Sequence, residues 1–365
     1  MKRHPSALKA GATIGILGSG QLGRMLAIAA AKLGYRTHIY ADVSGPAFDV
    51  AAQHTIAPYE DLGRMTAFAN TVDVVTYEFE NVPLGAAAAA QTATEVRPNP
   101  RALEVAQDRL VEKRFIDDLS IPVPAFAQID TAADLKAALT TIGTPAILKT
   151  CRFGYDGKGQ SRITSSEGAD WALKAIGGAP AILEAMVPFD CEISVICARG
   201  LDGTFVTYDS PRNIHRDGIL DTSTVPSGLP DSLLKSARDI AKQIAEALDY
   251  VGILTVELFV IEAKDGAPPQ LLVNEIAPRV HNSGHWTLEA CAISQFDNHI
   301  RAITGLPLGG TQRSADATMT NLIGSDIDVA EETFTQPGTS VHNYGKNEAR
   351  PGRKMGHVTQ LHGIK

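Results

Sequence analysis

The segment GILGSGQLGRM, residues 15–25, is a strand-to-helix turn that contains three glycines. Gly18, Gly20 and Gly23 follow the apolar run TIGIL with the spacing G-x-G-x-x-G, which predicts a tight turn opening a helix. Asp42 closes the next apolar run, at about the 20-residue distance that a ribose-binding carboxylate keeps in dinucleotide-binding proteins. The turn predicts a parallel α/β unit. It leaves open which anion the unit binds, because amides at a helix N-terminus favour any anion.

Length and charge narrow the class of protein. A chain of 365 residues is too long for one compact core and predicts two or three domains. The net charge of −8 argues against a nucleic-acid partner, and no apolar run reaches the roughly 18 residues of a membrane span. The four cysteines form no C-x-x-C pair, which argues against a zinc site or a disulfide framework. We expect a cytoplasmic protein.

The pattern of expected strands and helices changes along the chain, which predicts a multidomain protein with α/β and α+β regions. The first hundred residues alternate strands with helices, as a Rossmann-like parallel sheet requires. The segment RPNP, residues 97–100, is an extended connector, and one helix is expected over 102–119. From about residue 145, short strands between glycine-rich turns predict an antiparallel region. The last 60 residues predict a small β-rich domain.

Residues 252–280, GILTVELFVIEAKDGAPPQLLVNEIAPRV, predict a hairpin that brings two carboxylates together. Glu257 and Glu275 are equidistant from Gly266, so an antiparallel hairpin centred there sets their Cβ atoms about 4.5–5.5 Å apart. Two facing carboxylates repel unless a cation lies between them, and a shared Mg²⁺ with nucleotide phosphates meets that need. The alternative is a register shifted by one or two residues, which leaves each glutamate on a solvent face.

A glycine-rich loop follows Lys149 in the segment ILKTCRFGYDGKGQSRI. Its backbone amides can approach phosphate oxygens with Lys149 and Lys158 as counter-charges, although the loop lacks the Walker spacing. Asp156 lies within this cationic loop and is a candidate general base. The alternative is a surface hairpin without a ligand. Further on, main chain at 184–187 is a candidate for pairing with an adenine edge, and Glu192 for accepting from ribose hydroxyls.

Seven segments together resemble the ATP-grasp superfamily and, within it, the family of 5-(carboxyamino)imidazole ribonucleotide synthases. In chain order they are GSGQLGRM, TYEFENVP, GYDGKGQ, EAMVPFDCE, NIHRDGILDTSTVPSG, VNEIAPRVHNSGHWT and YGKNEARPGRKMGHV. The resemblance implies a Rossmann-like domain over 1–102, an ATP-grasp domain over 103–302 with a mobile lid at about 125–190, and a C-terminal domain over 303–365. It also implies a homodimer.

The resemblance implies the site residues one by one. ATP would contact Arg109, Lys149, Gly154, Tyr155, Asp156, Gly157, Lys158, Gly159, Gln160, Glu184, Ala185, Met186, Val187, Glu192, His215, Asn274 and Glu275. Mg²⁺ would bind Glu257 and Glu275. The substrate ribonucleotide would contact Gln21, Leu22, Glu78, Tyr155 and Asp156, with its phosphate on Lys346 and Arg353. Cys151 departs from the family pattern, which has a basic residue there in many members.

The implied reaction is the carboxylation of 5-aminoimidazole ribonucleotide (AIR) by ATP and bicarbonate, through carboxyphosphate, in purine biosynthesis. Asp156, Arg279 and Lys149 would be the catalytic residues, with Arg279 orienting bicarbonate and Asp156 taking the proton. His285 is expected in the core beside Trp286, and His281 stays open between a catalytic and a core role.

Three alternatives remain. Another ATP-grasp ligase, such as a formate-dependent glycinamide ribonucleotide transformylase, would share the ATP residues and differ in the acceptor. An NAD(P)-dependent oxidoreductase would explain only residues 13–42, and leaves the glutamate pair unexplained. A non-catalytic nucleotide-binding homologue is disfavoured by the intact candidate metal and phosphate residues.

Overall fold

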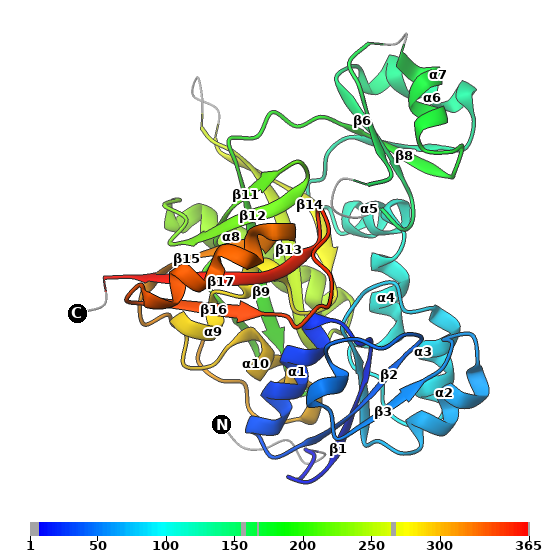
Figure 1. The fold of residues 1–365 in the computed structure, drawn as a ribbon. Helices are drawn as coiled ribbons and strands as arrows, with labels where there is room; N and C mark the ends of the chain where they lie inside the picture. The colour runs from blue at the N-terminus through cyan, green and yellow to red at the C-terminus, as the bar shows by residue number, and fades with distance from the viewer. Residues whose placement is uncertain (1–6, 155–157, 166–167, 264–267, 364–365) are drawn as a thin grey trace.

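The computed structural model describes residues 7–154, 158–165, 168–263 and 268–363 (Figure 1). Its N-terminal part is a parallel four-stranded sheet in the order β3-β2-β1-β4, as the alternating pattern predicts. The strands are β1 (Thr13–Leu17), β2 (Arg36–Ala41), β3 (Gln53–Ile56) and β4 (Val74–Tyr77), and the helices are α1 (Gln21–Lys32), α2 (Leu62–Ala69) and α3 (Leu84–Gln91). The glycine-rich turn joins the carboxyl end of β1 to α1.

The expected single helix over 102–119 is wrong, because two helices occupy this region. They are α4 (Pro100–Ala106) and α5 (Arg109–Asp118). Asp108 has an extended backbone between them, and its carboxylate accepts from the amides of Leu110 and Val111, an N-cap that starts a new helix. Pro100 of the expected connector is already the first residue of α4, capped by Asn99.

A small antiparallel sheet projects from the rest of the molecule, at the upper right of Figure 1. Its strand order is β5-β8-β6-β7, and α6 and α7 pack against each other and against its strands. The elements are β5 (Phe126–Ile129), α6 (Ala132–Ile142), β6 (Ala146–Thr150), β7 (Gln160–Ile163), α7 (Ala169–Ala175) and β8 (Ala181–Ala185). The sheet has its own apolar cluster, which explains how it stands apart from the main body.

The main body is a nine-stranded antiparallel sheet in the order β14-β13-β9-β11-β12-β15-β17-β16, with β10 paired to β9. The last three strands of the chain continue this sheet through β12 and β15, so the C-terminal region is joined to the central one by backbone hydrogen bonds. The strands are β9 (Cys191–Arg199), β10 (Phe205–Thr207), β11 (Arg212–Arg216), β12 (Ile219–Val225), β13 (Gly252–Ile261), β14 (Gln270–Ala277), β15 (Asp316–Ile323), β16 (Thr339–Asn343) and β17 (Lys354–His362).

Helices α8 (Asp231–Ala247), α9 (Thr287–Ala290) and α10 (Gln295–Thr304) complete the main body. Helix α10 packs on β13 and on α1, so it links the central sheet to the N-terminal domain. His299 of α10 lies within hydrogen-bond distance of the Thr76 hydroxyl and accepts from the amide of Ile253, which fixes both sides of this junction. Among the described residues, no helix is long and apolar enough to cross a membrane.

Candidate active site

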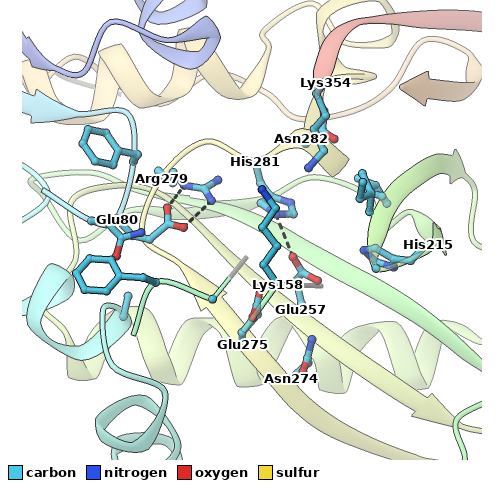
Figure 2. A pocket seen from close by; sticks show the side chains of 18 of the residues that line it. Glu80, Lys158, His215, Glu257, Asn274, Glu275, Arg279, His281, Asn282 and Lys354 are labelled. Carbon is cyan, nitrogen blue, oxygen red and sulfur yellow. Dashed lines mark hydrogen bonds and ion pairs between the residues drawn. The ribbon is translucent and has the colours of Figure 1, made fainter. Parts of the chain in front are cut away.

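One large cavity of about 880 Å³ lies where the three regions meet, and residues of each region line it. Figure 2 shows part of its wall, with Glu257, Asn274 and Glu275 in the lower half of the view and Lys354 at the top. The residues expected from the sequence that line it are Gln21, Leu22, Glu78, Arg109, Lys149, Gly154, Lys158, Gln160, Glu192, His215, Glu257, Asn274, Glu275, Arg279, Lys346 and Arg353. Residues far apart in the sequence therefore meet in one site.

Glu257 and Glu275 stand directly opposite each other in the β13–β14 ladder, as the hairpin symmetry predicts. The ladder shifts by a β-bulge immediately after this pair. Arg109 donates to Glu275 at 2.8 Å, and His281 Nε2 lies 3.0 Å from a Glu257 oxygen. Burial alone raises the pKa of Glu275, but the Arg109 guanidinium outweighs it and holds the pKa at about 2. The expected turn residue Gly266 lies outside the described residues.

A buried ion-pair cluster lies behind the cavity wall at Lys149. Its ammonium donates to Glu184 at 2.8 Å, and the ammonium of Lys113 lies 3.8 Å from the other Glu184 oxygen. Lys113 also donates to the backbone carbonyls of Val273 and Asn274 in β14. Burial raises the pKa of Glu184, but the charges of Lys149 and Lys113 outweigh it and lower the pKa overall. The cluster joins α5, β6, β8 and β14 and so fixes Lys149 beside the carboxylate pair.

Glu184 therefore forms ion pairs with two lysines and does not line the cavity. The sequence pattern did not predict these ion pairs. The main chain after it is also engaged, because Ala185 N–H donates to Ala125 O and Met186 N–H to Pro145 O. These two amides are therefore not available to an adenine edge, and pairing through other main-chain atoms of 184–187 stays a prediction. Neither Val187 nor Gly159 lines the cavity. Tyr155, Asp156 and Gly157 lie outside the described residues.

Another part of the cavity wall contains a hydrogen-bonded pair and two stacked aromatic rings. His215 Nδ1 lies 2.5 Å from a carboxylate oxygen of Glu192, which raises the pKa of His215 against the effect of burial. Phe189 and Phe259 stack with ring centroids 4.7 Å apart and planes 9° apart, and both line the cavity. A flat apolar surface beside Glu192 suits a purine base, and the sequence pattern did not single out these two rings.

The glycine-rich turn forms the part of the cavity wall that belongs to the N-terminal domain, and a carboxylate of the same chain binds its backbone amides. The carboxylate of Glu78, at the end of β4, accepts hydrogen bonds from the amides of Gly20 and Gly23. Glu78 is 6% exposed and lines the cavity beside Gln21 and Leu22. Asp42 is exposed and does not line it.

Basic side chains of the β16–β17 connection form another part of the wall. Lys346, Arg350, Arg353 and Lys354 all line the cavity. Lys346 donates to the carbonyl of Lys354 at 2.6 Å, and Arg353 to the carbonyl of Glu348 at 2.8 Å, so internal hydrogen bonds shape the loop. In an acidic chain, this local excess of positive charge suits a phosphate group.

Arg279 is paired with a residue that the sequence analysis did not consider. Its guanidinium binds both carboxylate oxygens of Glu80, as the two dashed lines in Figure 2 show. A third donor reaches the carbonyl of Val280 at 3.2 Å. The pair connects the loop after β4 to the segment after β14, so it holds the N-terminal domain against the carboxylate pair. Cys151 is a buried free thiol in the cavity wall rather than a cation.

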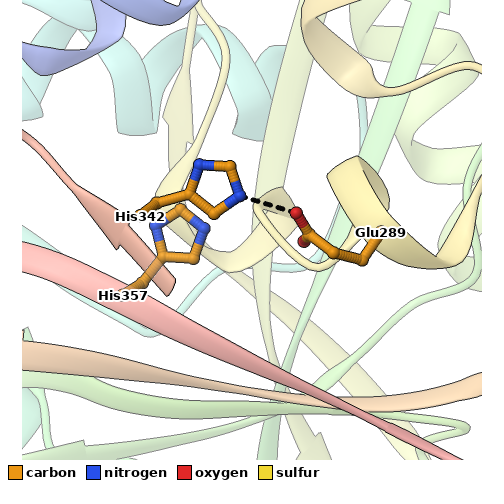
Figure 3. Close-up of side chains that lie close together, drawn as sticks. All are labelled: Glu289, His342 and His357. Atoms are coloured by element: carbon orange, nitrogen blue, oxygen red, sulfur yellow. Dashed lines mark hydrogen bonds and ion pairs between the residues drawn. The ribbon is translucent and has the colours of Figure 1, made fainter. Parts of the chain in front are cut away.

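A second cluster of metal-binding residue types lies near the cavity, at Glu289, His342 and His357 (Figure 3). His342 Nε2 lies 2.6 Å from a Glu289 oxygen, and the rings of His342 and His357 stack with planes 8° apart. Nearly parallel rings cannot both direct an in-plane lone pair at one ion, so we assign the cluster to packing between α9 and the β16–β17 hairpin. His285, expected in the core, is buried against His357.

Three family models match successive parts of the chain. They are the ribonucleotide synthetase preATP-grasp domain over 11–107, the ATP-grasp domain over 114–296, and the phosphoribosylaminoimidazole carboxylase C-terminal domain over 317–363. An N5-carboxyaminoimidazole ribonucleotide synthase of Brucella melitensis biotype 1 is 49% identical over 359 residues, covering 98% of both chains. The fold and the matches define an enzyme of the ATP-grasp class.

Solved structures agree with this class. An N5-carboxyaminoimidazole ribonucleotide synthetase in complex with ADP has a TM-score of 0.93 at 38% identity, covering 100% of this chain and 95% of the other. The Aspergillus clavatus enzyme in complex with ADP and AIR has a TM-score of 0.88 at 30% identity, covering 96% and 94%. The chain belongs to the N5-carboxyaminoimidazole ribonucleotide synthase family, whose members are ATP-dependent ligases of purine biosynthesis.

Proposed function

We propose that this chain carboxylates the exocyclic amine of AIR and consumes ATP and bicarbonate. The observation that carries the proposal is that one cavity contains the facing pair Glu257 and Glu275 together with two groups of cations. In this proposal the triphosphate contacts Arg109 and Lys149, and the ribonucleotide phosphate contacts Lys346 and Arg353. The Aspergillus clavatus structure supports a site for two ligands, because it contains ADP and AIR together on the same fold.

The donor atoms beside the carboxylate pair fit a Mg²⁺ ion. Glu257 and Glu275 offer carboxylate oxygens, and the amide oxygen of Asn274 is buried with no hydrogen-bond partner among the described residues. Hard oxygen donors of this kind are the ligands that Mg²⁺ prefers, usually in company with substrate phosphates. We propose that Glu257 and Glu275 hold the ion. When bound, it neutralises charge on the phosphoryl oxygens during transfer.

In the proposed reaction, a bicarbonate oxygen attacks the γ-phosphorus of ATP, ADP leaves, and carboxyphosphate forms. The amine nitrogen of AIR then attacks the carboxyl carbon, and the carbon–oxygen bond to phosphate breaks. Asp156, outside the described residues, accepts the amine proton. Lys149 offsets charge on the transferred phosphoryl group, and Arg279, held by Glu80, orients bicarbonate at the domain junction. Exclusion of water protects an intermediate that hydrolyses readily.

The remaining contacts are proposed from the family resemblance together with their position. ATP contacts the loop at 154–160, the segment at 184–187, Glu192, His215 and Asn274. AIR contacts Gln21, Leu22, Glu78, Tyr155 and Asp156. The engaged amides of Ala185 and Met186 restrict the segment at 184–187 to contacts made by other atoms.

We propose domains at 1–102, 103–302 and 303–365, with a lid at about 125–190, which the matched ranges and the separate apolar cluster of the small sheet support. All four cysteines are free thiols, in keeping with a cytoplasmic location. A homodimer is proposed from the resemblance, and light scattering would show it as twice the chain mass of 38.7 kDa.

An isotope experiment tests the proposed route. Bicarbonate labelled with ¹⁸O transfers one labelled oxygen to the released phosphate if it attacks the γ-phosphorus. Mass spectrometry of the phosphate formed with ATP and AIR present should therefore show one heavy oxygen. Unlabelled phosphate under the same conditions would contradict carboxyphosphate formation.

A further inference from the structure

The glycine-rich turn of residues 18–23 has the form of a phosphate-binding turn, yet a side chain of the same protein occupies it. Glu78 accepts from the Gly23 amide at 2.5 Å and from the Gly20 amide. These are the amides that face a pyrophosphate in a dinucleotide-binding protein, at the positive end of the 12-residue helix α1. The position at which an external anion would bind these amides is therefore occupied by the Glu78 carboxylate.

The carboxylate of Glu78 explains two of the three glycines of the motif and contributes to the third. A Cβ atom on Gly20 would lie 2.7 Å from a Glu78 oxygen, and a Cβ atom on Gly18 would overlap the Glu78 side chain. Gly18 also has a φ of +116°, which side-chain-bearing residues rarely adopt. A Cβ atom on Gly23 would lie 2.9 Å from the Gly18 carbonyl and 3.2 Å from a Glu78 oxygen. In this protein the glycines at 18 and 20 therefore make room for the Glu78 side chain, and the glycine at 23 makes room for the Gly18 carbonyl and for Glu78.

We propose that Glu78 is a specificity determinant that stands in for a phosphate group, so that the turn rejects phosphates and dinucleotides. A phosphate that approached the turn would be repelled by the buried carboxylate, and the amides of Gly20 and Gly23 would already be hydrogen-bonded. The same side chain lines the cavity beside Gln21 and Leu22.

The consequence for the substrate rests on the proposed function. With the turn closed to anions, the phosphate of a ribonucleotide is directed to the basic loop that contains Lys346, Arg350 and Arg353. The sugar hydroxyls, which are hydrogen-bond donors, are then the groups that suit the carboxylate of Glu78. One acidic residue thus sets both the rejection of dinucleotides and the direction in which the ribonucleotide lies.

Removal of the carboxylate should allow a small external anion to bind the amides of Gly20 and Gly23. In the full-length chain, Glu78→Ala removes the carboxylate from the turn. Glu60→Ala is a matched control because Glu60 is an exposed glutamate of the same domain. The melting temperature is measured with sodium formate or sodium phosphate against sodium chloride at equal ionic strength. We expect either anion to raise the melting temperature of Glu78→Ala by about 2 °C or more beyond the shift that the same anion causes in the wild type and in Glu60→Ala, which keep the basic loop but not a vacant turn.

A folded Glu78→Ala protein that responds to formate and phosphate no more than the wild type would overturn the proposal. If Glu78→Ala does not fold, the isosteric Glu78→Gln variant decides. Its side-chain oxygen can still accept from one of the Gly20 and Gly23 amides, but its NH2 group opposes the N–H of the other. We therefore expect a KM for AIR raised at least tenfold and an unchanged KM for ATP. Wild-type values for both would overturn the proposal.

The melting experiment contains no AIR and no ATP. Its result therefore stands even if the substrate assigned under the proposed function is wrong, and the KM experiment tests the link between the two.

Discussion

Arg279 and Glu80 form a two-point ion pair that joins the segment after β14 to the loop after β4. The pair lies in the same cavity as Glu257 and Glu275, so the position of the N-terminal domain and the position of the carboxylate pair are set together. A ribonucleotide held by the N-terminal domain is thereby brought to the place where the phosphoryl group is transferred.

Removing either of the paired carboxylates should abolish most of the ATP turnover. Glu257→Gln and Glu275→Gln each remove an oxygen ligand of the proposed ion, and we expect kcat to fall about 100-fold or more. Steady-state ADP release over a range of Mg²⁺ concentrations measures the effect. Glu246→Gln, an exposed change on α8, is the control and should match the wild type. Full activity of Glu275→Gln at ordinary Mg²⁺ concentrations would argue against the metal assignment.

Asp156→Asn should separate ATP binding from carboxylation. The substitution keeps the shape of the side chain and removes the group that accepts the amine proton. We expect the affinity for ATP, measured by calorimetry, to be unchanged, and AIR consumption to fall about 100-fold. Normal turnover in this variant would remove Asp156 from the mechanism.

Loss of Lys113 should destabilise the protein, because it leaves the buried carboxylate of Glu184 with Lys149 as its one ion-pair partner among the described residues. Lys113 is 1% exposed, and removing one member of a buried ion pair costs about 3–5 kcal/mol. We expect Lys113→Met to lower the free energy of unfolding in urea by about 3 kcal/mol. Lys235→Met, on the exposed face of α8, should change it by less than about 0.5 kcal/mol. Equal effects of the two substitutions would contradict the assigned role of the cluster.

His299 should make the fold sensitive to acid. Burial lowers the pKa of His299 to about 3, and its Nδ1 accepts from the Ile253 amide, so protonation would break that bond. The unfolded chain binds a proton below about pH 6.5 and the folded chain does not, so stability falls as the pH drops from 6.5 towards 3.

The lost stability amounts to about 3 kcal/mol at pH 4 for this one group. Urea unfolding at pH 7, 5.5 and 4 measures it, and His299→Gln should weaken the pH dependence by close to one proton. An unchanged slope in the variant would show that other groups control the acid response.

The sequence predicted those features of the site that depend on nearby residues. The hairpin symmetry placed Glu257 opposite Glu275, and the structure confirms this pairing. The register shift beside it, which pairs Leu258 with Val273, was not predicted from the symmetry. Lys113, Glu80 and the ring pair Phe189–Phe259 were missed. Lys113 belongs to a segment expected to be an ordinary helix, and only packing against β8 and β14 reveals its role.

The glycine-rich turn shows the same limit. Its spacing correctly predicted a strand, a tight turn and a helix. The occupant of the turn could not be predicted from the spacing, since Glu78 is 55 residues from Gly23 and reaches it only through the parallel pairing of β4 with β1. The local conformation is encoded locally, whereas the chemistry of the turn depends on a distant strand.

The most direct test of the account is ADP release with ATP, Mg²⁺ and bicarbonate, measured with and without AIR while AIR consumption is followed in parallel. We expect ADP to form in proportion to the AIR consumed and only when bicarbonate is present. ATP turnover that is indifferent to AIR would contradict the proposed acceptor, and ADP formation without a need for bicarbonate would contradict carboxylation.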